Sequence, residues 1–346
     1  MTTPTLAILG AGAWGTAFAL HLTRLPSAPR VILWEYDVPQ AQALARDRVN
    51  TRYLPDIPLP PSLRIAESLD EAVREASLLI AAPPVAALPE LIEACRRVFT
   101  AASSMTTPDV PPFFWLSKGL LIDGEHAVLP HQKLAPLWPN AVGVISGPSF
   151  AQEVAQGLPT AVVAAATDRA IAEQVAARIH GETLRVYIND DLSGVEIGGA
   201  VKNVLAIAAG ICDGLKLGHN ARATLITRGL AEMARLAEAL GGQRTTLMGL
   251  AGLGDLVLTC TGDLSRNRRV GMMLAEGLAL PDILTRLGHV AEGVPAAHAV
   301  TRLAQQHAIE MPIAATVSQI LDGRLAVQAA VEALLKRTPK KEFSYF

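Results

Sequence analysis

The segment Thr5-Leu-Ala-Ile-Leu-Gly-Ala-Gly-Ala-Trp-Gly15 leads from a short apolar run into a glycine-rich turn, and a helical stretch follows from Thr16 to Leu25. A strand, a Gly-x-Gly-x-x-Gly turn and a helix in this order predict a dinucleotide-binding turn. Gly10 permits the tight turn, Gly12 lets the backbone approach a pyrophosphate, and Gly15 allows the helix to pack closely on the strand. A plain glycine turn is the alternative, and the flanking strand and helix argue against it.

The second apolar run, Arg30 to Trp34, ends at Glu35, which follows Gly15 by about 20 residues, as the dinucleotide fingerprint requires. An acid at this place binds the ribose hydroxyls of the cofactor. Asp37 is the competing candidate for that role. Because a carboxylate repels the 2′-phosphate of NADPH, we expect NADH to be preferred over NADPH by roughly tenfold or more.

Short apolar runs continue to alternate with helical stretches as far as about residue 190. This alternation predicts a largely parallel, doubly wound sheet of the Rossmann type, in which ligands bind beyond the carboxyl ends of the strands. Lys118, Gly147 and Ser149 closely follow predicted strands and should converge near the cofactor. The further strands are expected at residues 78–82, 113–116, 142–145, 161–165 and 185–188, and helices at residues 68–76, 88–99 and 169–179.

The strand signals stop after about residue 190, and the rest of the chain has helical patterns interrupted by glycines. The sequence therefore predicts an α/β Rossmann-type, doubly wound N-terminal domain, residues 1–190, followed by an all-α C-terminal domain, residues 191–346. The composition does not change sharply at this junction, so the boundary is set to within about ten residues.

Lys202 lies in a strongly apolar stretch and is the only charged residue between Glu196 and Asp213. Its neighbours are apolar enough to bury a helix on all sides. A lysine in such a helix is desolvated, and desolvation lowers the pKa of an ammonium. Lys202 is therefore a candidate proton donor and acceptor near neutral pH. The alternative is a lysine that reaches from a core helix to the surface.

Two further groups of residues in the second half are candidates for the site. Residues 249–254 are rich in glycine and are expected to form a flexible loop that ends at Asp255. Asp255 either orients Lys202 or is the N-cap of the helix that follows. Ser265 stands before Arg266-Asn-Arg-Arg269, and a serine with arginines at a helix start predicts a site for a phosphate dianion. A solvated basic first turn is the alternative.

The composition excludes several classes of function. The chain has 346 residues and a net charge of −2, so it presents no overall positive field for nucleic acid. The three cysteines are scattered, which indicates no disulfide framework and favours a reducing, cytoplasmic compartment. The histidines are isolated from metal-ligand partners, so no metal site is predicted. We expect neither a signal peptide nor a segment that spans a membrane.

Several of these motifs, in their order along nearly the whole chain, closely resemble NAD(P)-dependent glycerol-3-phosphate dehydrogenases of the bacterial, soluble type. One motif alone is weak evidence, but together they are highly specific. Two segments depart from the family pattern, Ala82-Pro-Pro84 where Val-Pro-Ser or Val-Pro-Thr is usual, and Glu35-Tyr36 where a small residue followed by His or Arg is common. The matching segments are residues 10–15, 117–119, 146–151, 199–203, 220–229, 249–259, 265–269 and 292–293.

The resemblance implies reversible reduction of dihydroxyacetone phosphate to sn-glycerol 3-phosphate with NAD(P)H, for phospholipid synthesis, by a homodimer. Lys202 matches the family's proton acceptor, and we expect Lys118 to polarise the C2 oxygen and Asp255 to position Lys202. The expected substrate-binding residues are Lys118, Gly147, Ser149, Lys202, Asn203, Asp255, Ser265, Arg266 and Asn267. The expected cofactor-binding residues are Gly10, Gly12, Ala13, Trp14, Gly15, Glu35, Tyr36, Lys118, Ala151, Arg266, Val290 and Glu292.

Two other functions fit part of the sequence. A dehydrogenase acting on a 3-hydroxy acid also has the pattern Gly-x-x-x-Lys-Asn, which residues 198–203 match. A non-catalytic protein that senses NAD would need the glycine turn but would give Lys202 no purpose. The cluster at Ser265 and Arg266 favours the phosphorylated substrate, because a carboxylate does not need a site for a dianion.

Overall fold

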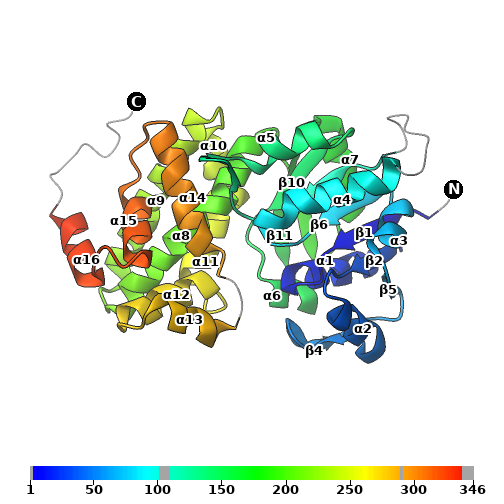
Figure 1. The fold of residues 1–346 in the computed structure, drawn as a ribbon, viewed down its shortest axis with the longest axis horizontal. Coiled ribbons are helices and arrows are strands. Elements are labelled where there is room, and N and C mark those ends of the chain that lie inside the picture. The colour runs from blue at the N-terminus through cyan, green and yellow to red at the C-terminus, as the bar shows by residue number, and fades with distance from the viewer. Residues whose placement is uncertain (1–2, 101–109, 289–290, 337–346) are drawn as a thin grey trace.

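The computed structural model describes residues 3–100, 110–288 and 291–336. They form two halves that lie side by side in Figure 1, a sheet with helices on both faces and a bundle of helices. This is the α/β Rossmann-type half followed by an all-α half that the sequence predicts.

The central sheet has eight strands in the order β12-β11-β10-β7-β6-β1-β2-β5. Neighbouring strands run parallel, except that β10 and β11 are antiparallel. All seven strands that the sequence predicts are present, whereas β5 is not predicted. The strands are β1 (Thr5–Leu9), β2 (Arg30–Trp34), β5 (Leu63–Ile65), β6 (Leu78–Ala81), β7 (Phe113–Trp115), β10 (Val142–Ser146), β11 (Thr160–Ala166) and β12 (Leu184–Ile188).

Both faces of the sheet are covered by helices. Because successive residues of a strand point to opposite faces, Leu6 and Ile8 of β1 join one hydrophobic cluster and Ala7 and Leu9 join another. The sequence predicts α1 (Ala13–Thr23), α3 (Leu69–Arg74), α4 (Leu88–Thr100) and α7 (Arg169–Ile179), and it does not predict α2 (Val38–Asp47), α5 (Pro130–Leu134) or α6 (Ala151–Gln156).

Two small hairpins project from this half. One consists of β3 (Val49–Asn50) and β4 (Leu54–Pro58), and the other of β8 (Leu121–Asp123) and β9 (His126–Val128). The sequence patterns predict neither hairpin. The second hairpin extends to the helical half, because Leu120 and Ala127 belong to the hydrophobic cluster of that half.

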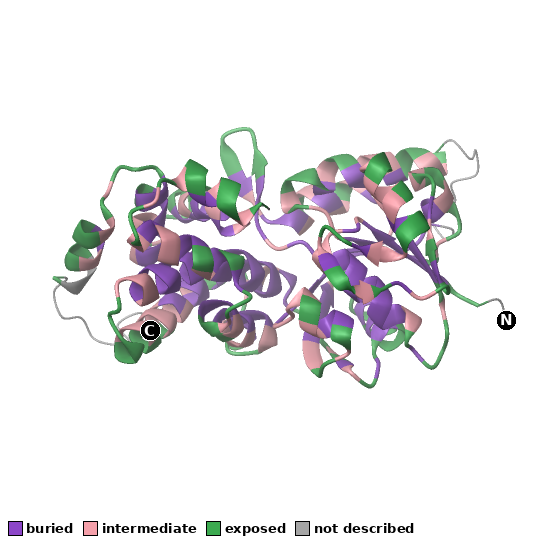
Figure 2. Ribbon diagram, turned by 90° about the horizontal axis from the view of Figure 1, so that it is seen from below, coloured by how far each residue is buried: buried purple, intermediate pink, exposed green. Residues whose placement is uncertain are grey.

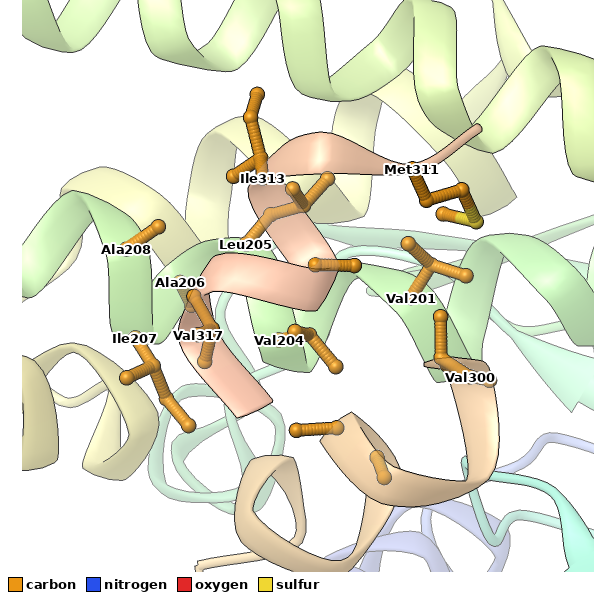
Figure 3. Close-up of a cluster of buried hydrophobic side chains, with 14 of the residues drawn as sticks. Val201, Val204, Leu205, Ala206, Ile207, Ala208, Val300, Met311, Ile313 and Val317 are labelled. Carbon is orange, nitrogen blue, oxygen red and sulfur yellow. The ribbon is translucent and has the colours of Figure 1, made fainter. Parts of the chain in front are cut away.

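The helical half is built around α8 (Leu192–Gly214), whose Asp191 N-cap accepts from the backbone N–H of Gly194 over 2.8 Å. Figure 3 shows side chains of α8, among them Val201 and Val204, in one cluster with residues of the surrounding helices. The other helices of this half are α9 (His219–Ala239), α10 (Arg244–Leu247), α11 (Asp255–Thr261), α12 (Arg266–Ala275), α13 (Leu280–Leu287), α14 (Gly293–Gln306), α15 (Pro312–Leu321) and α16 (Val327–Leu335).

α12 packs on α8 with very little space between the two backbones. A Cβ atom at Gly210 of α8 would lie 1.9 Å from the carbonyl oxygen of Arg268, and one at Gly271 of α12 would lie 2.0 Å from that of Ile207. Because nothing larger than glycine fits at either position, the start of α12 is held close beside α8.

The expectation of a flexible loop before Asp255 is wrong. Leu250–Gly254 forms a π-helical turn that continues directly into α11. Gly252 in this turn allows close packing, because a Cβ atom at that position would lie 2.1 Å from the carbonyl oxygen of Leu247. The N-cap of α11 is Gly254, so the alternative of Asp255 as a helix cap is also wrong.

Among the described helices, α8 is the one long and apolar enough to cross a membrane, with 23 residues and a mean hydropathy of 1.5 in its most apolar window. That window is completely buried inside the protein, and Figure 2 shows the helical half with a buried interior and exposed residues outside. α8 therefore has the surroundings of a core helix.

Candidate active site

A cavity of about 610 Å³ opens where the two halves meet. The sheet half contributes the glycine turn and the segment after β7, and the helical half contributes α8, the end of α11 and the start of α12. The predicted site residues that line the cavity are Ala13, Trp14, Lys118, Ser149, Ala151, Lys202, Asn203, Ser265, Arg266, Asn267 and Glu292.

Two ammonium groups share the carboxylate of Asp255 beside this cavity. Nζ of Lys202 donates to Oδ1 and Nζ of Lys118 donates to Oδ2, each over 2.5 Å. Lys202 also donates to the hydroxyl of Thr259 over 2.9 Å, and Lys118 donates to the carbonyl of Gly147 over 2.9 Å. Because an ammonium has three N–H groups, each lysine keeps one N–H for a further acceptor.

Burial and the mutual proximity of these groups set their charges. Burial lowers the pKa of Lys118 to about 8. The positive charge of Lys202 also lowers this pKa, whereas the negative charge of Asp255 raises it. Although burial alone raises the pKa of a carboxyl group, the two ammonium groups hold that of Asp255 below its ordinary value. Asp255 is therefore ionised at neutral pH, and Lys118 can exchange a proton near pH 8.

Thr259 belongs to this cluster and is not among the site residues expected from the sequence. Its hydroxyl accepts from Lys202 and donates to the backbone carbonyl of Asp255 over 2.6 Å. The available signal was the spacing, since residues four apart on a helix share a face. That signal requires a helix that already includes Asp255, whereas the sequence predicts a loop that ends at Asp255, with a helix after it only as the alternative.

Ser265 stands at the start of a helix, as predicted: it is the N-cap of α12, and its hydroxyl accepts from the backbone N–H of Arg268 over 3.2 Å. Arg266 is exposed and lines the cavity. Arg268 instead pairs with Asp213 over 2.7 Å, and Arg269 is exposed outside the cavity lining. One of the three arginines in the predicted phosphate cluster therefore faces the cavity.

Asn203 and Asn267 connect α8 to the start of α14. Nδ2 of Asn267 donates to Oδ1 of Asn203 over 2.9 Å, and Oδ1 of Asn267 accepts from the backbone N–H of Gly293 over 2.9 Å. Burial raises the pKa of the adjacent Glu292, and the charge of Arg266 opposes this shift. Val290, another expected cofactor residue, lies outside the described residues.

The glycine turn has the geometry expected from the sequence. Gly10 has a φ of 115°, which favours glycine. A Cβ atom at Gly15 would lie 2.0 Å from the carbonyl oxygen of Gly10. The space beside Gly12 is open, because no atom of the described residues would lie within 4 Å of a Cβ atom at this position. The indole N–H of Trp14 is buried and has no hydrogen-bond acceptor among the residues that the structure describes.

Glu35 and Asp37, the two candidates for the ribose hydroxyls, have different partners. Glu35 accepts from the backbone N–H of Ala11 over 2.7 Å and from that of Asp37 over 3.1 Å. Asp37 is the N-cap of α2 and accepts from the backbone N–H of Gln40. Glu35 is thus the acid in contact with the glycine turn. Tyr36 is 83% exposed and stands outside the cavity lining.

The cavity also has a wall of residues that are not among the expected site residues. Residues 53–57, in and next to β4, line it together with Phe150, Gln152 and Gln156. Within the described residues, no group of three or more His, Cys, Asp or Glu side chains could hold a metal ion.

A doubly wound sheet, a glycine turn with an acid at the end of β2, and buried lysines beside the cavity define the class of NAD(P)-dependent dehydrogenases. Sequence models described as the N-terminus and the C-terminus of NAD-dependent glycerol-3-phosphate dehydrogenase match residues 5–172 and 191–332. The chain belongs to this family of oxidoreductases.

Individual relatives agree with the family assignment. The chain is 49% identical over 341 residues to glycerol-3-phosphate dehydrogenase (NAD(P)+) of Dechloromonas aromatica, which covers 98% of this chain and 99% of the relative. It is 51% identical over 340 residues to that of Nitrosospira multiformis, covering 97% and 99%. The crystal structure of glycerol-3-phosphate dehydrogenase from Coxiella burnetii superimposes with a TM-score of 0.88 at 44% identity, covering 97% of this chain and 99% of that one.

Proposed function

We propose that the chain catalyses the reversible reduction of dihydroxyacetone phosphate to sn-glycerol 3-phosphate with a nicotinamide cofactor, for phospholipid synthesis. The observation that carries this proposal is the pair of ammonium groups on Asp255, beside a cavity that also has Arg266 at its lining. Two lysines on one carboxylate leave an excess of positive charge, which suits an anionic substrate whose oxygen gains negative charge during reduction.

The residues around the glycine turn fit a dinucleotide. The open backbone at Gly12 and the N-terminus of α1 can approach a pyrophosphate. The buried indole N–H of Trp14, which has no acceptor among the described residues, can donate to a bound cofactor. We assign Gly10, Gly12, Ala13, Trp14, Gly15 and Glu35 to cofactor binding, with Ala151 and Glu292 at the cavity lining. A bound nicotinamide supplies the hydride.

We assign the proton transfer to Lys202. Its ammonium, held by Asp255 and Thr259, gives a proton to the C2 oxygen during reduction and takes it back in the reverse direction. Lys118 polarises the same oxygen with its remaining N–H. Asp255 positions both lysines, because its two oxygens bind one ammonium each.

We assign the substrate phosphate to the start of α12. Arg266 offers a guanidinium at the cavity, and the helix N-terminus after Ser265 favours an anion. Asn267 keeps one amide N–H beyond the one it donates to Asn203. Binding energy at the phosphate orients the reacting carbonyl. The remaining substrate-binding assignments are Gly147, Ser149 and Asn203.

NADH oxidation with dihydroxyacetone phosphate, run beside unphosphorylated dihydroxyacetone and a 3-keto acid, tests the proposal. We expect strong preference for the phosphorylated ketone. Turnover of the 3-keto acid would support a 3-hydroxy-acid dehydrogenase instead, and cofactor binding without turnover of any ketone would support a sensor.

We further propose that NADH is preferred over NADPH, that the chain acts as a homodimer in the cytoplasm, and that the domains meet between residues 190 and 191. The acid in contact with the glycine turn supports the cofactor preference. The three cysteines are free and buried, which agrees with a reducing compartment. The last strand ends at Ile188 and α8 begins at Leu192, which supports the boundary.

A further inference from the structure

Glu196 is a buried carboxylate that the proposed mechanism does not use. It lies on α8, the helix that carries Lys202, and its side chain is 1% exposed. One oxygen accepts from the backbone N–H of His131 over 2.9 Å, and the other lies 2.5 Å from Nδ1 of the His131 ring. Both of these bonds go to one residue of the sheet half, on α5. A carboxylate in the interior is costly without such partners, so the pair joins the two halves firmly.

His131 lies at the end of a segment that begins with Lys118, which we term the Lys118 arm (residues 118–131). The arm contains the β8–β9 hairpin and contacts the helical half at separate points, whereas its Leu121 belongs to a hydrophobic cluster of the sheet half. Leu120, Ala127 and Leu129 belong to the hydrophobic cluster around α8, and the backbone N–H of Ala127 donates to the side chain of Gln306 on α14 over 2.8 Å. The arm therefore packs against the helical half, through β9 on α14 and through His131 on α8, although it comes from the sheet half of the sequence.

We propose that Glu196 is a positioning residue of the active site: by holding His131, it fixes the Lys118 arm on α8, so that Lys118 and Lys202 meet on the same carboxylate. The Lys118–Asp255 contact fixes one end of the arm and the Glu196–His131 pair fixes the other. Release of the second end lets the arm shift on α8. A shift of about 1 Å at a reacting group can lower a rate by about 100-fold. The inference rests on the role of Lys118 in the proposed function.

The test compares Glu196→Leu, Glu196→Gln and the matched control Glu232→Leu. Glu232 is another buried glutamate of the helical half, and it accepts from the backbone N–H groups of Ile313 and Ala314 rather than from the Lys118 arm. Each variant is compared per folded active site, counted by titration with NADH fluorescence. This normalisation removes any loss that is caused only by unfolding.

We expect Glu196→Leu to lower kcat for dihydroxyacetone phosphate by about 10- to 100-fold, with the KM for NADH changed less than about threefold. Glu196→Gln should keep most of kcat, because its amide can accept from the His131 N–H and donate to a neutral Nδ1. Glu232→Leu should lower the free energy of unfolding and leave kcat unchanged. An unchanged kcat in Glu196→Leu, an equal loss in Glu232→Leu, or a Glu196→Gln variant as impaired as Glu196→Leu overturns the proposal.

His131→Ala provides a second route if Glu196→Leu does not fold, because the His131 side chain is partly exposed, at 21%. It should lower kcat with the same small change in KM for NADH, and an unchanged kcat counts against the proposal. In the double variant with Glu196→Gln, the loss should equal that of His131→Ala alone, since both changes act on one contact. A wild-type protein that oxidises no NADH with dihydroxyacetone phosphate contradicts the proposed function itself, and only an active wild type tests Glu196.

Discussion

Nζ of Lys202 donates to Oδ1 of Asp255 over 2.5 Å, and neither side chain is more than 9% exposed. Electrostatic interactions are stronger in such a poorly hydrated place than at the surface. The pair therefore fixes the ammonium in one position instead of letting a long, flexible side chain sample many. This arrangement suits a group that must transfer a proton to a defined atom of a substrate.

Replacement of Lys202 by alanine should lower kcat by a factor of about 10² to 10⁴, the usual contribution of general acid–base catalysis. NADH binding should persist, because the glycine turn lies on the other half. Single-turnover kinetics at saturating NADH measure the hydride transfer directly, and fluorescence titration verifies that the cofactor site is intact. Hydride transfer near the wild-type rate would show that Lys202 does not carry the proton.

The pH dependence of reduction should report the charge of Lys118. This lysine must be protonated to polarise the C2 oxygen, and burial lowers its pKa to about 8. kcat/KM for dihydroxyacetone phosphate should therefore fall as the pH rises above about 8. In Lys118→Arg the falling limb should move to higher pH, because a guanidinium stays charged there. A limb at the same pH in both proteins would assign it to another group.

The sequence predicts the sheet half well where elements are long or strongly apolar. It misses β5, which has three residues and is too short for a period to be recognised. It also misses α2, whose buried face consists of Leu44, so that little apolar periodicity is present. The reversed direction of β11 is not encoded in the alternation of strands and helices.

The site was predictable where one residue type at one place has a distinctive chemistry, as for Lys202 in its apolar helix. The contact of Lys118 with Asp255 and the place of Thr259 were not predictable from spacing. The carboxylate of Asp255 binds Lys118 as well as Lys202, and Thr259 joins the cluster, only because α11 packs beside α8. The Glu196–His131 pair likewise depends on a hairpin that no pattern indicates.

Replacement of Arg266 by alanine should weaken use of dihydroxyacetone phosphate far more than use of dihydroxyacetone. Loss of one charge-assisted contact to a phosphate is worth about 2 kcal/mol, or roughly a 30-fold change in the ratio of the two kcat/KM values. Arg269→Ala is the matched control, because this arginine lies on the same helix and outside the cavity lining. An unchanged ratio in Arg266→Ala would mean that this arginine does not bind the phosphate.

The cofactor preference depends on the charges near the end of β2. Glu35 contacts the glycine turn, and it would face the 2′-phosphate of NADPH with like charge. Arg30, Arg46 and Arg48 are cations close to Glu35 in the sequence. Each is engaged elsewhere, with Glu75, with Asp47, and with the carbonyls of Pro60 and Leu63, respectively.

Arg52 is a further cation near the end of β2, and its guanidinium lies 3.7 Å from the carboxylate of Asp37. It is more than half exposed and also lies over the ring of Tyr53. Arg52 is therefore the described cation best placed to assist NADPH, so Arg52→Ala should lower NADPH use more than NADH use.

We expect wild-type kcat/KM to favour NADH by roughly tenfold or more, which requires only about 1.4 kcal/mol. Glu35→Gln distinguishes charge repulsion from a loss of local structure. The glutamine carries no charge, but its amide oxygen can still accept from the backbone N–H of Ala11. If Glu35 repels the 2′-phosphate, NADPH use should rise in Glu35→Gln while NADH use falls slightly. In Glu35→Ala the acceptor for Ala11 is lost as well, so NADH use should fall further. Steady-state kcat/KM with each cofactor decides the question, and a wild-type protein that uses NADPH as well as NADH refutes the preference.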